Sequence, residues 1–447
     1  MKYLNKIIEY GLYLFVFLLP WQTRWIIKAG ELNGGYFEPK TISLYGVDIV
    51  LLIILLLNCF IAISSLKAKS LKLTAIWWLI AGLDLFIFVS IFFAPNKLIA
   101  LEHYLWFLLG VGLFWLITNA EYNKSKLLWS LVAGAILQAG LGIYQFLAQS
   151  TFASKWLGMA VHNPSNLGVS VIETLGGERW LRAYGGLDHP NVLGGLLVIA
   201  VLLIFNFQFS HLRLRASAEQ AIFKQFNNLT IFYFLLFTSL FLSFSRSAWL
   251  GLIIGLATAL GISLIKKDSP MRNQILKFSI IGVLVFAVLG NIYSDLLSPR
   301  LNLNTRLEQK SITERMESVD QAKSLIKNNL FFGVGIGNYT LALAEQNPGQ
   351  PAWTYQPVHN TPLLILAEIG IFGFIFFVTM LCAMCYVLCR SILKNKNSES
   401  TLNLTILVAL VAMFQFDHFW WSLHFGILLF WFILGLTQAE IKKIITE

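Results

Sequence analysis

The stretch ITERMESVDQAKSLIKNNLFFGVGIGNY at residues 312–339 decides how this chain is organised, because it forms the middle of the longest polar run in an apolar sequence. The polar run extends from Ser294 to Asn360 and ends in Pro357-Val358-His359-Asn360, where an apolar segment begins. Nine apolar segments precede this run and three follow it. We therefore predict a large loop outside the membrane, with an imidazole at its boundary with the next crossing.

The composition indicates an integral membrane protein built from helices. The chain has 447 residues, of which 57% are hydrophobic and 13% are charged, whereas about 25% of the residues of a soluble domain are charged. Its apolar segments have the roughly 17 to 25 residues that a helix needs to cross a bilayer, and strands of a membrane barrel would be near 10 residues with strict alternation. We predict one polytopic all-α domain over residues 1–447 with about twelve transmembrane helices. The first two are expected near 7–27 and 42–64.

The formal charge of +10 is explained by membrane topology rather than by nucleic-acid binding. Cytoplasmic loops collect Lys and Arg, and SLKAKSLK at 65–72 and both ends of the chain are basic. We therefore predict that both termini lie in the cytoplasm and that two long loops, 149–190 and 294–360, lie at the outer face. The lipid bilayer is an expected partner and nucleic acid is not.

Two features inside apolar segments have structural interpretations. Asp84 lies near the middle of the third segment, where an unpaired carboxyl costs several kcal/mol, so a hydrogen bond to a neighbouring helix is favoured over a functional role. Three of the four cysteines share one helical face with no His or carboxylate nearby, namely Cys382, Cys385 and Cys389. Apolar packing is favoured over metal binding for them, and we predict no metal site and no cofactor.

The polar run is expected to contain an amphipathic helix followed by a tight turn. Ser311 and Glu314 have the spacing of a capping box, and apolar residues recur at helical spacing at Ile312, Met316, Val319, Ala322 and Ile326. Such a helix is expected to lie along the membrane surface. Glycines follow at Gly333, Gly335 and Gly337. Because no strand precedes them and no GK[ST] follows, they indicate a chain reversal rather than a nucleotide site.

Several polar side chains are directed outward by this topology. Arg182 and His189 precede Pro190, which suits the first turn of a helix. Arg246 lies in the short turn FSRSAWLG at 244–251, flanked by two serines and against the positive-inside bias. An anion-binding role is therefore favoured for Arg246 over a snorkelling arginine.

Two other outward positions have competing interpretations. Arg315 lies in the loop helix, where a solvated charge is the simpler interpretation. The segment FDHFWWSLHFG at 416–426 places Asp417 and His418 beside a tryptophan pair. An aromatic belt at the membrane interface is favoured there over catalysis.

The outward residue types favour transfer chemistry on an anionic substrate. The sequence has no GxSxG elbow, no HExxH and no carboxylate cluster with metal spacing. Arginine binds phosphate oxygens through two nitrogens, and several arginines at a membrane surface suit a lipid-linked diphosphate. A histidine can take a proton from a hydroxyl at neutral pH. Together these residues predict transfer of a group from a phosphate leaving group to an alcohol.

Three motifs occur in an order that resembles the bacterial O-antigen ligase and polymerase superfamily. They are RAYGGLDHPNVLGGLL at 182–197, FSRSAWLGLIIG at 244–255, and the pattern FGVGIGNY…HNTPLLILAEIGIFG at 332–373. The resemblance implies a GT-C-like glycosyltransferase in the bacterial cytoplasmic (inner) membrane, with its active site at the outer face. Such enzymes pass a glycan from undecaprenyl diphosphate to a glycolipid, glycan or protein acceptor without metal or cofactor.

The resemblance also implies roles for individual residues. Arg182, Arg246 and Arg315 would hold the donor diphosphate, and His359 would be the base that activates the acceptor. The outward positions of His189, Asn360, Asp417 and His418, rather than the resemblance, make them candidates for accessory roles, since the segment FDHFWW is not assigned to a ligase pattern. Attack opposite the leaving diphosphate would invert the anomeric configuration.

Other functions remain open at the level of sequence. Within the superfamily, ligation to a lipid A core, polymerisation of repeat units and protein O-glycosylation share these motifs. Outside it, a transporter or flippase of polyprenyl-linked glycans would carry broken or charged helices near the midplane and often an internal repeat. A lipid-binding scaffold is the third reading, and it would not need His359.

Overall fold

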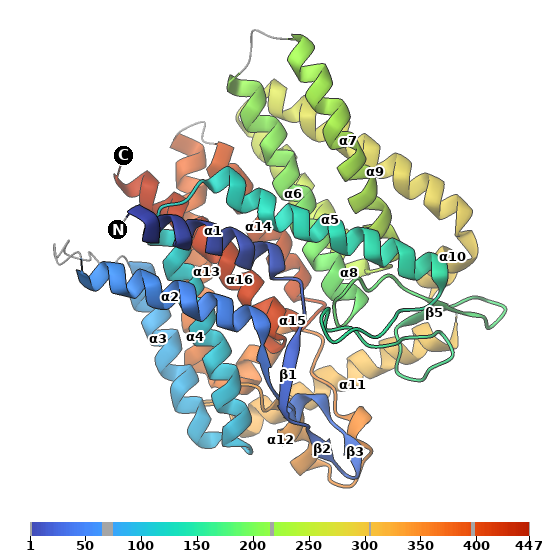
Figure 1. Cartoon of the computed structure of the whole chain (residues 1–447). Helices are drawn as coiled ribbons and strands as arrows, with labels where there is room; N and C mark the ends of the chain where they lie inside the picture. The colour runs from blue at the N-terminus through green and yellow to red at the C-terminus, as the bar shows by residue number, and fades with distance from the viewer. Residues whose placement is uncertain (1, 65–74, 215–218, 304, 395–397, 447) are drawn as a thin grey trace.

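The computed structural model describes residues 2–446 apart from 65–74, 215–218, 304 and 395–397, and the side chains of 206–229 are not described. Helices form nearly all of its regular structure (Figure 1). Among the described residues, seven segments are long and apolar enough to cross a membrane: Ala75–Phe93, containing α3 (Ala75–Ser90), α4 (Lys97–Asn119), α5 (Lys124–Ala148), α8 (Arg246–Ile265), α9 (Ser269–Ile292), α13 (Thr361–Lys394) and α16 (His424–Thr446). The prediction of an all-α membrane fold is confirmed.

Further helices complete the bundle. These are α1 (Lys2–Leu18), α2 (Gly46–Ser64), α6 (Pro190–Leu214), α7 (Glu219–Leu242) and α14 (Ser398–Phe414). The predicted start of a helix at Pro190 is confirmed. The basic stretch 65–72 lies outside the described residues.

The boundaries predicted for the first two crossings are wrong. Helix α1 ends at Leu18, and β1 (Arg24–Lys28) pairs antiparallel with β4 (Ile42–Tyr45). The helix stops there because the residue before a proline, here Leu19 before Pro20, is disfavoured in the α conformation. A short apolar run such as WII does not distinguish helix from strand by periodicity. A second small hairpin, β2 (Glu31–Leu32) with β3 (Gly35–Tyr36), lies between the two strands.

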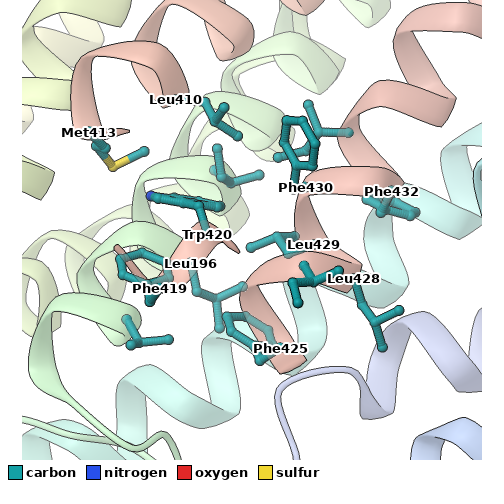
Figure 2. Packing of buried hydrophobic residues seen from close by; sticks show 14 of the residues in the cluster. Leu196, Leu410, Met413, Phe419, Trp420, Phe425, Leu428, Leu429, Phe430 and Phe432 are labelled. Carbon is teal, nitrogen blue, oxygen red and sulfur yellow. The ribbon is translucent and has the colours of Figure 1, made fainter. Parts of the chain in front are cut away.

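Among the seven candidate membrane spans, α16 is the most enclosed, and it packs along α4. Close approach of helices in a membrane depends on small residues. Here a side chain at Gly110 of α4 would overlap the indole of Trp431 in α16. Figure 2 shows the aromatic part of this core, where Phe419 and Trp420 of α15 (Phe419–Ser422) pack with Leu196 of α6 and Met413 of α14.

The polar elements gather at one end of the molecule. Figure 1 shows α10 (Ser294–Asn302), α11 (Arg306–Asn328) and α12 (Tyr339–Gln346) with the strands toward the lower right, whereas the two chain ends lie near each other at the left. The strands include the pair β5 (Val171–Glu173) and β6 (Arg179–Leu181). The two long polar loops, 149–190 and 294–360, therefore meet at this end.

The predicted capping box of the loop helix is wrong. Helix α11 begins at Arg306, so Ser311 and Glu314 lie inside it. The Thr305 side chain does not cap the helix, and the Glu173 carboxylate of β5 accepts a 3.2 Å hydrogen bond from the backbone N–H of Leu307. A distant carboxylate thus satisfies a first-turn N–H group that a local motif was expected to satisfy.

The glycine-rich turn is a chain reversal, as the sequence predicted. In the structure it docks on a break in α13. The backbone N–H groups of Val334 and Gly335 each donate 2.9 Å hydrogen bonds to carbonyl groups of α13, at Ala367 and Glu368. Those bonds are possible because α13 is broken at Gly370, whose φ of 69° and ψ of −177° are not helical. Only glycine adopts this backbone conformation readily.

Candidate functional site

A cavity of about 590 Å³ opens between the start of α8 and the helix α11. We call it the arginine cavity, because its charged lining consists of four cations and one carboxylate: Arg246, Arg300, Arg315, Lys323 and Asp320. The remaining lining is polar at Asn191 and Ser247 and apolar at Leu250, Leu303, Ile312, Met316, Val319 and Phe416. The apolar stripe of α11 therefore faces, in part, this cavity.

Two of these arginines are held by one buried carboxylate. Glu308 pairs with Arg246 at 3.1 Å and also with Arg300. Arg300 donates in addition to the carbonyl of Phe244 at 3.1 Å and 3.2 Å, and Arg246 donates to the carbonyl of Arg300 at 3.1 Å. The turn before α8, the helix α10 and the start of α11 are thus fixed to one another by charge.

Arg315 differs from these two arginines. It lines the cavity, and its guanidinium has no hydrogen-bond or salt-bridge partner among the described residues, although its backbone carbonyl accepts a 2.8 Å hydrogen bond from Ser318 Oγ. Its positive charge still acts on the nearby histidines, as it contributes to lowering the pKa of His359. A guanidinium without a protein carboxylate partner, facing a cationic cavity, is available to an anionic ligand. Contact of Arg315 with a diphosphate stays a prediction, as does the alternative that its charge is solvated.

Arg182 lies one layer behind the cavity. It is 4% exposed and donates to the Ser243 carbonyl at 2.8 Å and to Ser170 Oγ and Asn191 Oδ1 at 2.7 Å each. Of these partners, Asn191 lines the arginine cavity. Contact of Arg182 with a diphosphate stays a prediction, and its visible role is to fix the first turn of α6 against the turn before α8.

Asp417 connects this layer to the C-terminal helices. Its carboxylate accepts a 2.8 Å hydrogen bond from Asn191 Nδ2 and a second bond from Ser247 Oγ, and its carbonyl accepts one from Thr361 Oγ1 at 2.6 Å. Burial raises the pKa of Asp417, and the side-chain bonds oppose that shift. Ser247, the residue after Arg246, therefore donates its hydroxyl hydrogen bond to Asp417, although it also lines the arginine cavity.

The aromatic belt predicted around Asp417 is wrong. The following rings of Phe419, Trp420 and Trp421 are 3%, 1% and 5% exposed, whereas belt residues lie at the lipid–water interface. They belong to the core, and a glycine at 195 in α6 leaves room for Phe419 and Trp420. The three rings at 419–421 therefore pack in the core next to the buried Asp417, and they do not face lipid.

His359 and His418 are neighbours, although 59 positions separate them. Their ring centroids are 5.1 Å apart at an angle of 63°. Burial lowers the pKa of His359 to about 4, and burial followed by His359 and Arg315 lowers the pKa of His418 well below its usual value. Both imidazoles are therefore neutral at pH 7, and each is a weaker base than an unperturbed histidine.

The other two predicted accessory residues act as caps. Asn360 accepts a 2.9 Å hydrogen bond from the backbone N–H of Leu363 in the first turn of α13 and donates to the carbonyl of Gln415 at 3.1 Å. His189 Nδ1 accepts from the backbone N–H of Asn191 at 3.1 Å. Both residues hold helix starts next to the histidine pair.

A second cavity, of about 480 Å³, is lined in part by His418. We call it the aromatic cavity, because rings from four regions line it: Tyr36, Phe37, Tyr45, Trp106, Tyr339, Trp353 and Tyr355. Charged or titratable side chains share the lining at Arg24, Glu38, His103, Asp188, Glu368, His418 and His424. The hairpin 24–45 and the loop 352–357 supply much of its wall.

Sequence reasoning missed Arg300, Glu308 and Asn191. Arg300 follows Pro299 in an ordinary polar stretch, and no motif marks it. Asn191 stands beside Pro190 inside a quoted motif, so its place in RAYGGLDHPN was an available signal. Among the described residues, no group of three or more His, Cys, Asp or Glu side chains is arranged to hold a metal ion.

Smaller predictions inside the bundle have a structural outcome. Asp84 shares a hydrogen bond with Tyr104 of the neighbouring α4, as favoured from the sequence. The four cysteines are free thiols.

These features define a polytopic membrane protein with a cationic, partly apolar cavity beside a buried histidine pair. Residues 231–378 match the sequence model of a family described as O-antigen ligase, and this match confirms the predicted resemblance. The matched residues include Arg246, Arg300, Arg315 and His359. A search among curated proteins found no match. The match and the apolar helices together indicate a bacterial inner-membrane protein with ligase-type glycan transfer at the family level.

Proposed function

We propose that this protein transfers a glycan from undecaprenyl diphosphate to an acceptor hydroxyl at the outer face of the bacterial cytoplasmic membrane. The arrangement has about twelve crossings and both termini in the cytoplasm. The observation that carries the proposal is the arginine cavity, in which four cations and an apolar lining lie together beside two neutral histidines. A polyprenyl diphosphate combines the same two chemistries, an anionic head and an apolar tail.

The donor diphosphate would bind to Arg246, Arg300 and Arg315. The first two are preorganised by Glu308, and Arg315 is not committed to a protein carboxylate. Charge that develops on the leaving oxygen is stabilised best by donors already in place. Arg182 supports this site through Asn191. The apolar residues Leu250, Ile312 and Met316 offer a surface for the first prenyl units.

The acceptor would enter the aromatic cavity, and the histidine pair would accept its proton. His359 is the base that the sequence predicts, and His418 is in ring contact with it. Arrival of a dianionic donor raises the pKa of both imidazoles, because nearby negative charge favours the protonated form. The acceptor oxygen then attacks the anomeric carbon from the side opposite the diphosphate, with inversion.

The lining of the aromatic cavity favours a sugar acceptor over a protein side chain. Aromatic faces combined with a few placed polar groups fit a ligand that has both apolar and hydroxyl-bearing faces. This supports ligation to a glycolipid or polymerisation of a glycan, and makes protein O-glycosylation the alternative acceptor class.

The test uses purified full-length protein in detergent with radiolabelled undecaprenyl-diphosphate glycan. Wild type should release lipid diphosphate and extend or transfer the glycan, and Arg246→Ala should fail while remaining folded, because Glu308 keeps Arg300 as a partner. Lys310→Ala is the matched control, since Lys310 pairs with Glu314 on the exposed side of α11. Movement of the labelled lipid across liposomes without transfer would support the flippase reading instead.

A further inference from the structure

We propose that His418 is the residue of the histidine pair that takes the proton from the acceptor hydroxyl. This inference rests on the proposed function and assigns one step of it. His418 lines the aromatic cavity, whereas His359 lines neither the aromatic nor the arginine cavity. The residue that touches the acceptor is therefore the one contributed by the C-terminal segment.

The hydrogen bonds of His418 leave its Nε2 atom free to accept a proton. Ser422 Oγ donates to the backbone carbonyl of His418 at 3.1 Å, and His418 Nδ1 lies 2.6 Å from the same Oγ. A hydroxyl has one proton and a carbonyl only accepts, so both contacts are satisfied when Nδ1 carries the hydrogen and donates it to Oγ. Nε2 then has a lone pair and acts as the base.

The position of His418 is fixed from the donor side. The preceding residue, Asp417, is bonded by Asn191 and Ser247, and both of these line the arginine cavity. Two consecutive residues thus connect the two cavities: Asp417 is held by the donor wall and His418 lines the acceptor cavity. Rigid support of this kind keeps a base within reach of its substrate.

The transfer balances with His418 as the base. The acceptor O–H proton moves to Nε2 as the oxygen forms its bond to the anomeric carbon. The bond from that carbon to the diphosphate oxygen breaks, and the electron pair leaves with the lipid diphosphate. The protonated imidazole then returns its extra proton to water through the aromatic cavity. His359, edge to face with His418, holds the ring plane and is a positioning residue in this step.

Chemical rescue separates the two histidines. We would measure transfer by purified full-length His418→Ala, His359→Ala and the control His162→Ala, with and without added imidazole. His162 lies in the first outer loop and lines neither of the two cavities. His418→Ala should lose about 100-fold or more in kcat with an unchanged donor KM, and imidazole should restore part of it, because the vacated space opens into the aromatic cavity. His359→Ala should be slowed and not restored.

Two further variants protect the test from folding artefacts. His418→Gln keeps a side chain of similar size and should be as inactive as His418→Ala while unfolding like wild type. Ser422→Ala should lower kcat without changing the donor KM, and Ser422→Thr should recover it, because the hydroxyl selects the tautomer. Rescue of His359→Ala by imidazole, or near-wild-type activity of His418→Gln, would overturn the assignment. Absence of transfer by wild type would instead overturn the proposed function beneath it.

Discussion

The arginine cavity and the aromatic cavity share the Asp417–His418 dipeptide but are built in different ways. The arginine cavity is held by charge, since one buried carboxylate, Glu308, ties together arginines from two helices. The aromatic cavity is enclosed by rings from a small hairpin, a loop and several helices. The difference indicates that the proposed donor site is fixed before a ligand arrives, whereas the proposed acceptor site depends on the shape of peripheral segments.

The largest effect is expected on removal of Arg300, which the charge network of the arginine cavity requires. Arg300→Ala leaves Glu308 buried with Arg246 as its remaining partner. Breaking a buried ion pair costs about 3–5 kcal/mol, and we expect the lower end because that partner remains. Denaturant unfolding in detergent micelles measures the loss.

The double variant Arg300→Ala with Glu308→Ala is the control for this prediction. It removes the buried carboxylate that has lost one of its two partners and should recover part of the lost stability, although donor binding stays weak. A single variant as stable as wild type would show that the network does not hold the cavity, and the contrast between the two cavities would then be lost.

Arg315 tests the other half of the donor site. Because it has no protein carboxylate to lose, Arg315→Ala should leave the unfolding free energy within about 0.5 kcal/mol of wild type. Loss of a charge-assisted contact of about 1.5–3 kcal/mol should raise the donor KM roughly 10- to 100-fold. Steady-state transfer at saturating acceptor measures it, with Lys310→Ala unchanged. An unaltered donor KM would remove Arg315 from the diphosphate site.

The parts of this fold that the sequence predicts are those encoded locally. Apolar length gives the helices, Pro190 marks the start of α6, and three glycines within five residues give the reversal at 333–337. Arg246 was singled out because its turn is short and its charge is on the unexpected side. Each of these signals lies within a few residues of the feature that it predicts.

The parts that sequence reasoning missed depend on distant partners. Glu308 pairs with Arg246 and caps nothing nearby, and the start of α11 is satisfied by Glu173 from the other polar loop. Asp417 is bonded to Asn191, 226 positions earlier, whereas the tryptophan pair that follows it in the sequence suggested an interfacial belt. The aromatic cavity depends on the hairpin 24–45, whose outer strands lie largely within the two crossings predicted at 7–27 and 42–64. No periodicity or motif in one segment specifies such contacts.

An intermediate effect is expected at Gly337, in the wall of the aromatic cavity. Its φ is +70°, and an added Cβ would lie 2.4 Å from the ring of His103. Gly337→Ala should lower the unfolding free energy by roughly 1–3 kcal/mol and raise the acceptor KM while the donor KM stays constant. Gly349→Ala is the control, because Gly349 has φ +84° but nothing within 4 Å. Equal losses in both variants would attribute the effect to backbone strain alone.

The smallest effect is expected at Trp353, which lines the aromatic cavity and is 68% exposed. Stacking on an aromatic ring contributes about 0.5–1.5 kcal/mol, so Trp353→Ala should raise the acceptor KM roughly 3- to 10-fold. The donor KM should not change, since Trp353 does not line the arginine cavity. Trp156→Ala is the control, because Trp156 is 85% exposed and lines neither of the two cavities. If Trp353→Ala changed the donor KM instead, the two cavities would not be separate sites, and the acceptor would have to approach His418 from the arginine side.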